Sequence, residues 1–299
     1  MKIFNIGSLN IDHVYKVPYF VMPGETLTTE SLEDICGGKG LNQSIALARA
    51  GVKNLYHIGA VGKDGDILKD ALAKDNINMN FLEERDSVSG HTVIQVNEDG
   101  ENCILRFPGA NHTIEEKQVD DALKISEDGD YILLQNETNI LQYILEHKEA
   151  SNLKIALNPS PMTKSLLSLD FNKIDFLILN EIEAKMLLDL DLKIDVSGDG
   201  LLDKLKLKFP HMEIVLTLGV DGAMVQVGEK RVCQPAYKVD TVDTTGAGDT
   251  FCGYYLASRM ENKSIEESLE LASKAAAIAV TRKGATPSIP YYDEVLKFN

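Results

Sequence analysis

The chain has 299 residues, of which 44% are hydrophobic, enough to bury a large core. It carries 46 acidic side chains against 30 Lys and Arg, for a formal net charge of -16. Such an acidic chain is poorly suited to the phosphates of nucleic acid or to an anionic membrane surface, so neither is expected as a partner. A bound phosphate group must therefore be held locally, by backbone amides, a helix end or a divalent ion.

Cysteine usage and the N-terminus point to a reducing compartment. The cysteines are Cys36, Cys103, Cys233 and Cys252, with no C-x-x-C pair, so a zinc site or disulfide framework is not expected. Residues 1–7 are typical of a first strand and not of a signal peptide. No apolar run approaches the roughly 18 residues of a membrane helix, and a cytoplasmic location is expected.

The first third of the chain predicts a small projecting sheet. Segments 14–21, 26–35, 91–96 and 102–107 alternate apolar and polar residues and are separated by turn signals such as Pro23-Gly24 and Asp99-Gly100. This alternation is typical of half-exposed antiparallel strands. The segments lie among strand–helix units, so the sheet is either a lid or a decorated edge.

The second half predicts a parallel sheet covered by helices. Short apolar runs at 132–134, 155–157, 176–179 and 214–216 alternate with helical stretches such as 139–150 and 181–190. Continuous apolar runs suit strands buried on both faces, which indicates an α/β sandwich. The runs end in Gln135-Asn136-Glu137, Asn158, Asn180 and Thr217. Ligands bind at the carboxyl ends of such strands, although each polar residue alone could simply begin a loop.

The segment with the strongest chemical signal is residues 242–251, Val-Asp-Thr-Thr-Gly-Ala-Gly-Asp-Thr-Phe. It predicts a strand, a glycine-rich turn and a helix from about Phe251 to Met260. Converging amides at a helix start favour an anion. Asp249 lies inside that turn, where it could accept a proton from a hydroxyl that attacks a phosphate. The spacing alone leaves an ordinary helix N-cap as an alternative role for Asp249.

Two further segments are weaker signals when taken alone. Residues 36–43, Cys-Gly-Gly-Lys-Gly-Leu-Asn-Gln, open a helix that runs to about Ala50 and do not form a Walker A loop. Residues 7–12, Gly-Ser-Leu-Asn-Ile-Asp, follow the first strand. Their amide and carboxylate groups could hold two sugar hydroxyls, or could form an Asx turn.

In combination these motifs are much more specific. They are Gly7 with Asn10-Ile11-Asp12, Pro23-Gly24-Glu25-Thr26, Gly37-Gly38-Lys39-Gly40 with Asn42, Gly109-Ala110-Asn111, Asn158-Pro159, Asn180 with Glu183, Thr217-Leu218-Gly219, residues 243–251, and Thr281-Arg282-Lys283-Gly284-Ala285 with Pro287-Ser288. The whole chain resembles the ribokinase-like carbohydrate kinases of the phosphofructokinase-B type. The resemblance implies a three-layer α/β sandwich with a mostly parallel central sheet and a small antiparallel β lid. It implies a single domain over residues 1–299, with lid strands inserted at about 12–36 and 88–108.

The same resemblance implies a role for individual residues. Asp249 matches the general base, with the amides of Gly246, Ala247 and Gly248 as an anion hole. The matching sugar-binding positions are Asn10, Ile11, Asp12, Gly38, Lys39, Gly40, Leu41, Asn42, Glu137 and Asp249. The matching nucleotide-binding positions are Asn180, Thr217, Leu218, Gly219, Val220, Asp221, Gly222, Gly248, Asp249 and Ser273. Glu183 matches the acidic position tied to Mg²⁺, and a K⁺ site is implied at Asp243, Thr245, Ala279, Arg282, Gly284 and Ser288.

The implied activity is transfer of phosphate from Mg·ATP to the terminal 5-hydroxyl of D-ribose, in a homodimer assembled through the lid. Alternatives remain open: a kinase for deoxyribose, another pentose or hexose, or a nucleoside, and a non-catalytic sensor of a sugar or nucleotide. A Rossmann-type oxidoreductase is not favoured, because no G-x-G-x-x-G follows the first strand.

Overall fold

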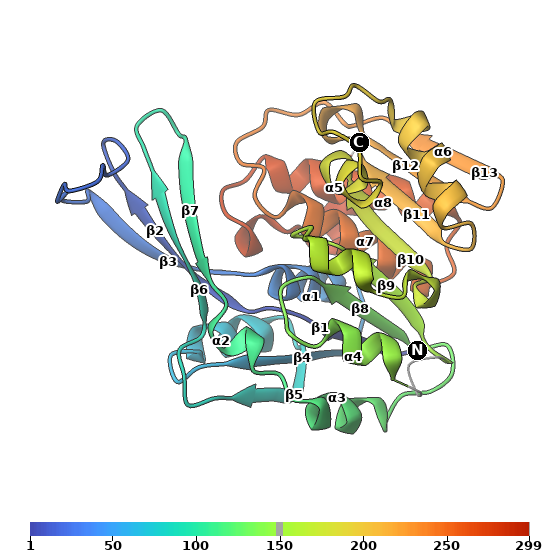
Figure 1. Cartoon of the computed structure of the whole chain (residues 1–299), viewed down its shortest axis with the longest axis horizontal. Helices are drawn as coiled ribbons and strands as arrows, with labels where there is room; N and C mark the ends of the chain where they lie inside the picture. The colour runs from blue at the N-terminus through green and yellow to red at the C-terminus, as the bar shows by residue number, and fades with distance from the viewer. Residues whose placement is uncertain (148–151, 299) are drawn as a thin grey trace.

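The computed structural model describes residues 1–147 and 152–298 and contains two β-sheets (Figure 1). The strands of the large sheet are β1 Ile3–Ile6, β4 Leu55–Val61, β5 Asn78–Glu84, β8 Tyr131–Gln135, β9 Lys154–Asn158, β10 Phe176–Asn180, β11 Glu213–Thr217, β12 Ala223–Val227 and β13 Lys230–Gln234. They lie side by side in the order β13-β12-β11-β10-β9-β8-β1-β4-β5. From β5 to β11 in this order neighbours are parallel, while β12 and β13 add an antiparallel edge.

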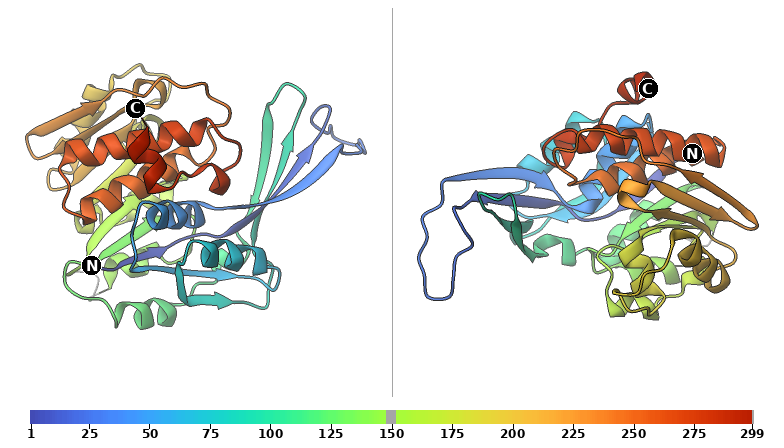
Figure 2. Two further views of the ribbon diagram at one scale, coloured as in Figure 1. Left: turned by 180° about the vertical axis from the view of Figure 1, so that it is seen from behind. Right: turned by 90° about the horizontal axis from the view of Figure 1, so that it is seen from above.

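Helices cover both faces of the large sheet, as the views from opposite sides show (Figures 1 and 2). One face carries α1 Lys39–Arg49, α2 Asp66–Lys74, α7 Ala247–Met260, α8 Ile265–Val280 and α9 Tyr292–Lys297. The other carries α3 Glu116–Leu123, α4 Leu141–Glu146, α5 Glu181–Leu187 and α6 Gly198–Lys208. The short 3₁₀ turns are η1 Gly109–His112, η3 Lys164–Ser168, η4 Phe171–Lys173, η5 Gly219–Asp221 and η6 Thr286–Ser288. The expected three-layer sandwich is confirmed.

The apolar strands fill two cores because successive side chains point to opposite faces. Leu133 and Ile178 join the core under α1, α7 and α8, whereas their neighbours Ile132 and Leu177 join the core under the other helix layer. Burial on both faces is what the continuous apolar runs predicted.

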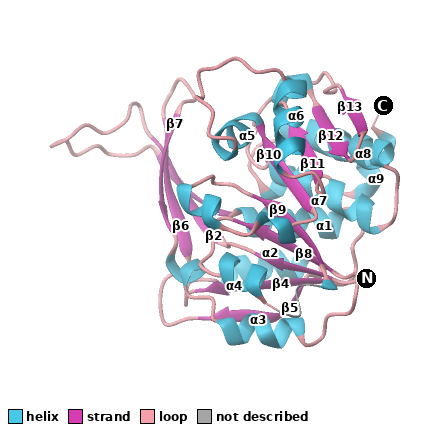
Figure 3. Cartoon of the chain, turned by 45° about the vertical axis from the view of Figure 1, so that its right-hand side comes forward, coloured by secondary structure: helices cyan, strands magenta, loops and turns pink. Residues whose placement is uncertain are grey.

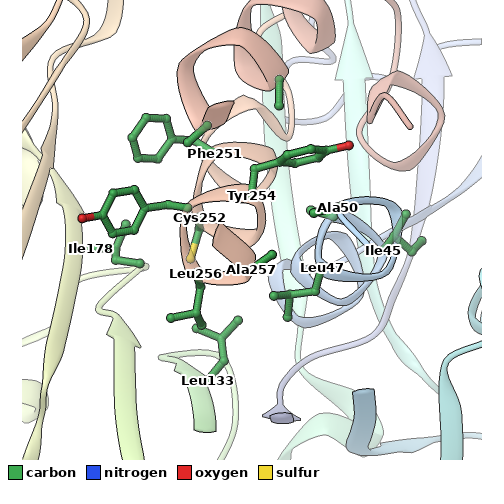
Figure 4. Close-up of a cluster of buried hydrophobic side chains, with 14 of the residues drawn as sticks. Ile45, Leu47, Ala50, Leu133, Ile178, Phe251, Cys252, Tyr254, Leu256 and Ala257 are labelled. Carbon is green, nitrogen blue, oxygen red and sulfur yellow. The ribbon is translucent and has the colours of Figure 1, made fainter. Parts of the chain in front are cut away.

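The packing of α1 against α7 positions the site described below (Figure 4). Gly253 of α7 faces Ala46 of α1 so closely that a Cβ on the glycine would lie 2.4 Å from the Ala46 Cβ. One turn toward the start of each helix, the same contact brings Asp249 against Asn42 and Gln43. The absent side chain at residue 253 is therefore a requirement for the close approach of these polar groups.

The second sheet, here called the small sheet, extends away from the main body (Figures 1 and 3). It consists of β2 Asn10–Lys16, β3 Ser31–Gly37, β6 Gly90–Val96 and β7 Asn102–Phe107, in the order β3-β2-β6-β7. The expected antiparallel pairing is found between β2 and β3 and between β6 and β7, whereas β2 and β6 pair in parallel from Asn10 and Gly90 onward. Both strands leave the main body in the same direction, and β3 and β7 return beside them.

Several predicted boundaries shift. The strand predicted over 14–21 begins at Asn10 and ends at Lys16, and the one predicted over 26–35 begins at Ser31. The helix predicted over 139–150 is α4, 141–146, and residues 148–150 lie outside the described part. The helix predicted to Leu190 ends at Leu187, shortly before Asp189 adopts a left-handed backbone with φ 55.

No strand leads directly into Asp243, because the last strand in the described residues, β13, ends at Gln234 and the residues between them form a loop, which corrects the prediction for that segment. The amides of Val242 and Asp243 instead donate to the carbonyl of Val280, at 2.8 and 3.2 Å. Val280 ends α8, where carbonyls lack partners within the helix. The segment is thus held by a helix end and not by a strand ladder.

Within the same described part, no helix combines the length and apolar character needed to cross a bilayer.

Candidate active site

The Asp249 carboxylate lies in the first turn of α7 and accepts hydrogen bonds from another helix. Gly246, with φ 76, is the N-cap of α7 and Asp249 is its third residue. Asn42 Nδ2 donates to Asp249 Oδ2 at 2.9 Å, and Gln43 Nε2 donates to Oδ1 at 2.8 Å. The N-cap alternative for Asp249 is therefore wrong, because its side chain serves α1 and not the first amides of α7.

A buried network of amide side chains supports this carboxylate. Gln43 Oε1 accepts from Gln135 Nε2 at 2.7 Å, and the same nitrogen donates to Asn5 Oδ1 at 2.9 Å. Asn5 Nδ2 then donates to Ser44 Oγ at 2.7 Å. Gln43, Gln135, Asn5 and Ser44 are all 0% exposed. Such a network orients Asp249 through Gln43, since each buried amide would be costly without its partner.

Burial dominates the electrostatics of Asp249 and raises the pKa of its carboxyl group. The charge of Lys39 and the amides of Asn42 and Gln43 oppose this increase without cancelling it. Burial alone would lower the pKa of Lys39, but the carboxylates of Asp249 and Glu137 outweigh it and keep this pKa above its usual value. The site thus places a buried carboxylate of raised pKa beside a cation that stays charged.

Two further predicted sugar-binding carboxylates, Glu137 and Asp12, are held by hydrogen bonds. Glu137 is 7% exposed and its Oε2 accepts from the Lys39 amide at 3.1 Å and from the Ser8 hydroxyl. Asp12 accepts from Thr92 Oγ1 at 2.5 Å. Burial raises the pKa of Asp12, with the Thr92 hydroxyl acting against it.

Four predicted sugar-binding positions differ from a simple picture in which each residue would be in a turn or would contact a ligand through its side chain. Asn10 opens β2 and its Oδ1 accepts from Asn111 Nδ2 at 2.8 Å, so it is not part of an Asx turn. The side chains of Ile11 and Leu41 lie in the hydrophobic core. Gly40 packs on the backbone of Gly7. Ile11, Gly40 and Leu41 would therefore support a ligand through their backbone and not through side-chain contact.

A cavity of about 870 Å³ lies beside the first turn of α7. Most of the predicted nucleotide positions line it: Asn180, Thr217, Gly219, Val220, Asp221, Gly222, Gly248 and Ser273. Leu218 does not, because its side chain lies against Gly198 at the start of α6. The volume of this cavity is within the range of pockets that bind a drug-sized ligand.

Further lining residues were not identified from the sequence. They include Tyr237, Phe251, Ala276, Ala277 and Val280. Ser273, Ala276, Ala277 and Val280 repeat at three to four residues along α8, and this helical spacing was the available signal. The Ser273 hydroxyl is buried and has no hydrogen-bond partner among the described residues, so it is available to a ligand.

The start of α7 joins the cavity to the polar cluster. Ala247 and Gly248 line the cavity, while Asp249, the next residue, faces α1. α7 has 14 residues, and its N-terminal amides and dipole favour an anion. A phosphate at this helix start would lie next to the carboxylate.

Two predicted metal-linked positions have defined local roles. Glu183 and Asn180 form a capping box at the start of α5, with Glu183 Oε2 accepting from the Asn180 amide at 3.0 Å. Asp243 Oδ1 accepts from the amide and hydroxyl of Thr245, and Oδ2 accepts from the Gly284 amide at 2.9 Å. Partial burial acts to raise the pKa of Asp243, but these hydrogen bonds bring it below its usual value. Asp243 is therefore an ionised group near the C-terminal end of α8.

The remaining predicted cation positions lie around the same end of α8. Ala279 is in the last turn of α8, and its carbonyl accepts from the Arg282 amide at 3.0 Å. The Arg282 side chain points elsewhere, to Glu294 at 2.5 Å. Ser288 donates its hydroxyl to the Ala285 carbonyl at 2.7 Å.

Comparison with known proteins gives the family. The model of the pfkB family of carbohydrate kinases matches residues 1–291. The chain belongs to this family. It is 35% identical to a ribokinase of Haemophilus influenzae over 98% of this chain and 96% of that protein. It is also 30% identical to a deoxyribokinase of Salmonella typhi over the full length of both.

Solved structures agree with this assignment. The ribokinase of Arabidopsis thaliana complexed with ribose and ATP superposes with a TM-score of 0.88, at 28% identity and with 99% of this chain and 98% of that chain covered. The ribokinase of Thermotoga maritima gives a TM-score of 0.88 at 31% identity, with 100% and 99% covered. This pfkB kinase is therefore an ATP-dependent carbohydrate kinase with the ribokinase fold.

Proposed function

We propose that this kinase transfers the γ-phosphoryl group of ATP to the terminal 5-hydroxyl of D-ribose, with Asp249 as the general base. The position of Asp249 carries the proposal. Its carboxylate faces Asn42 and Gln43, whereas Ala247 and Gly248 of the same helical turn line the large cavity. An acceptor hydroxyl beside Asp249 would face the phosphate end of a nucleotide in that cavity.

In the proposed step, Asp249 accepts the hydroxyl proton as the oxygen forms its bond to the γ-phosphorus. The bond from that phosphorus to the bridging oxygen breaks, and ADP leaves. Phosphoryl transfer depends mainly on positioning and on stabilisation of charge. The amides of Gly246, Ala247 and Gly248 would supply that stabilisation at the positive end of α7, and Lys39 adds a positive charge beside Asp249.

Ribose is proposed as the acceptor because the side chains around Asp249 are densely polar. Asn10, Asp12, Lys39, Asn42 and Glu137 provide donors and acceptors for the hydroxyls of a sugar ring. A sugar that lacks one hydroxyl would leave a buried group unpaired, which costs about 1–3 kcal/mol. The names of the relatives include both ribokinase and deoxyribokinase, so the choice between these sugars is open to direct measurement.

We propose Mg²⁺ and K⁺ as the metal ions of this kinase. The described residues contain no group of three or more His, Cys, Asp or Glu placed to hold a metal. This fits Mg²⁺, which is commonly bound by one or two carboxylates together with substrate phosphates, and Glu183 is the proposed carboxylate. K⁺ would be held at Asp243, Thr245, Ala279, Arg282, Gly284 and Ser288. The ionised Asp243 and the negative end of the α8 dipole both favour a cation there.

We propose that residues 1–299 form a single domain in which the small sheet is the lid, and that two copies pair through it. Register and alternation place Leu32, Leu105 and Phe107 on one face of the small sheet. They are 52%, 68% and 52% exposed, and a second copy would remove this apolar surface from water. Light scattering should give twice the mass of the chain, and Leu105→Glu should shift it to the monomer.

We also propose a cytoplasmic setting, because Cys36, Cys103, Cys233 and Cys252 are free thiols. Cell fractionation tests this proposal, and recovery of the protein outside the cytoplasm would contradict it.

The test of the activity is an ADP-release assay over D-ribose, 2-deoxyribose, other pentoses and hexoses, and nucleosides. D-Ribose should give the highest kcat/KM. Turnover with a different preferred acceptor would keep the kinase assignment and overturn ribose. Phosphate at a position other than the 5-hydroxyl would overturn the proposed geometry at Asp249.

A further inference from the structure

A row of polar side chains crosses one face of the small sheet, close to where the sheet leaves the main body. Asp12 of β2 lies opposite Thr92 of β6, and Thr92 lies opposite Arg106 of β7. Directly opposed residues project from the same face of a sheet. The Thr92 hydroxyl donates to Asp12, so the row is also joined by a hydrogen bond.

Arg106 connects this row to the main body. Its Nη1 lies 3.0 Å from Oε1 of Glu137, which follows β8. Glu137 Oε2 is bonded from the other side, by the Lys39 amide and the Ser8 hydroxyl. The Glu137 carboxylate is thus fixed from two directions, by the main body and by the small sheet.

Glu137 is much more buried than its partner Arg106, and this difference determines what the loss of Arg106 would cost. The side chain of Glu137 is 9% exposed, whereas that of Arg106 is 34% exposed. An ion pair between two exposed groups contributes little. Here the loss of Arg106 would leave a nearly buried carboxylate with fewer partners, which is a larger perturbation than the loss of a surface pair.

We propose that Arg106 is a positioning residue for the acceptor sugar: it holds the Glu137 carboxylate in place from the small sheet. The inference rests on the proposed function, which places Glu137 in the acceptor site. The formal charges nearby are three carboxylates, Asp12, Glu137 and Asp249, against the cations Lys39 and Arg106. This balance favours a neutral polyhydroxyl acceptor over an anionic one. Recognition of its hydroxyls by Glu137 then depends on the position of the small sheet.

The test compares Arg106→Met, Arg106→Lys and Glu137→Gln by steady-state kinetics on the preferred sugar. Arg106→Met should raise the sugar KM about 10-fold, with kcat within about 3-fold and the KM for ATP unchanged. Arg106→Lys keeps the positive charge and should restore part of the loss. Lys16→Met is the matched control, because Lys16 is a cation of the same sheet that pairs with Glu30 at 2.8 Å. Lys16→Met should leave the sugar KM, kcat, the KM for ATP and the melting temperature as in the wild type.

A double-mutant cycle identifies the partner through which Arg106 acts. In the Glu137→Gln background, Arg106→Met should change the sugar KM less than 2-fold. An unchanged KM in Arg106→Met beside a raised KM in Glu137→Gln would overturn the role of Arg106 and keep the proposed function. Unchanged KM values in both variants would overturn both the role of Arg106 and the placement of the acceptor at Glu137. An equal 10-fold effect of Arg106→Met in both backgrounds would also overturn the inference. Wild-type turnover over the sugar panel tests the proposed function separately.

Discussion

Asp249→Asn is the most direct test of the proposed chemistry, because it keeps the shape of the side chain and removes the proton acceptor. The structure indicates that an amide can be accommodated at this position. Asn42 Oδ1 is buried and has no hydrogen-bond partner among the described residues. Rotation of the Asn42 amide would let this oxygen accept from the new amide, so the contact between α1 and α7 should survive.

The expected effect is a fall in kcat of about 10²–10⁴-fold, the usual contribution of a positioned general base. This corresponds to about 3–5 kcal/mol of activation free energy. The sugar and ATP dissociation constants should change much less, because Gln43, Lys39 and the cavity residues remain. The loss should therefore appear in kcat and in kcat/KM together.

The stability of Asp249→Asn should change little or increase, although its activity is lost. The folded-state pKa of Asp249 is raised by burial, so above this pKa the ionised carboxylate lowers the free energy of unfolding. Substitution by Asn removes that cost while it also removes the attraction to Lys39. The melting temperature at neutral pH should stay within about 3 °C of the wild type or rise.

The assay is initial-rate ADP formation, with calorimetric binding of ATP and sugar measured on the same preparations. Asp128→Asn is a suitable control, because Asp128 is exposed and precedes β8, at the edge of the sheet remote from the site. A variant at residue 249 that binds both substrates and keeps more than a tenth of the wild-type kcat would refute the general-base role.

Three further substitutions test the surroundings of this carboxylate. Gln43→Leu removes a hydrogen bond that lowers the pKa of Asp249. The acid limb of the pH profile of kcat/KM should therefore move to higher pH, and kcat should fall about 10-fold. An acid limb at the wild-type pH would show that Gln43 does not tune the pKa of the base. Asp243→Ala should lower activity and blunt the response to K⁺, and equal wild-type rates in K⁺ and in a bulky organic cation would count against an activating ion. The kcat/KM for ribose should exceed that for 2-deoxyribose by roughly 5- to 150-fold, and Asn10→Met should reduce this ratio mainly by harming ribose; a ratio near one in the wild type would remove the reason for the choice of sugar.

Much of the fold could be predicted from local patterns. Runs such as 176–179 are apolar at every position, and only burial on both faces of a sheet accommodates such a run, so the parallel sheet followed. The small sheet was visible in its alternating segments, but its pairing was not. The parallel pairing of β2 with β6 depends on both strands leaving the main body side by side, and no local pattern encodes this direction.

The candidate site likewise has features that the local sequence predicts and features that it does not. The glycine-rich start of α7 and the acidic residue within it are local features, and so their chemistry was readable from the chain. The sequence could not show whether Asp249 caps its own helix or faces another helix, because both roles use the same residue at the same spacing. The packing of Gly253 on Ala46 decides between them by bringing α1 within hydrogen-bonding distance.

The sequence by itself determined which groups are available: the amides of a glycine-rich helix start, a carboxylate beside them, and polar residues after apolar strands. Only the tertiary structure decided which of these groups meet. Gln43 and Asp249 are 206 positions apart. Arg106 lies in β7 of the small sheet, whereas Glu137 follows β8 of the large sheet. Contacts of this kind arise because helix packing and strand register bring distant segments together. Packing and register are set by the whole hydrophobic core and not by the few polar residues that come into contact.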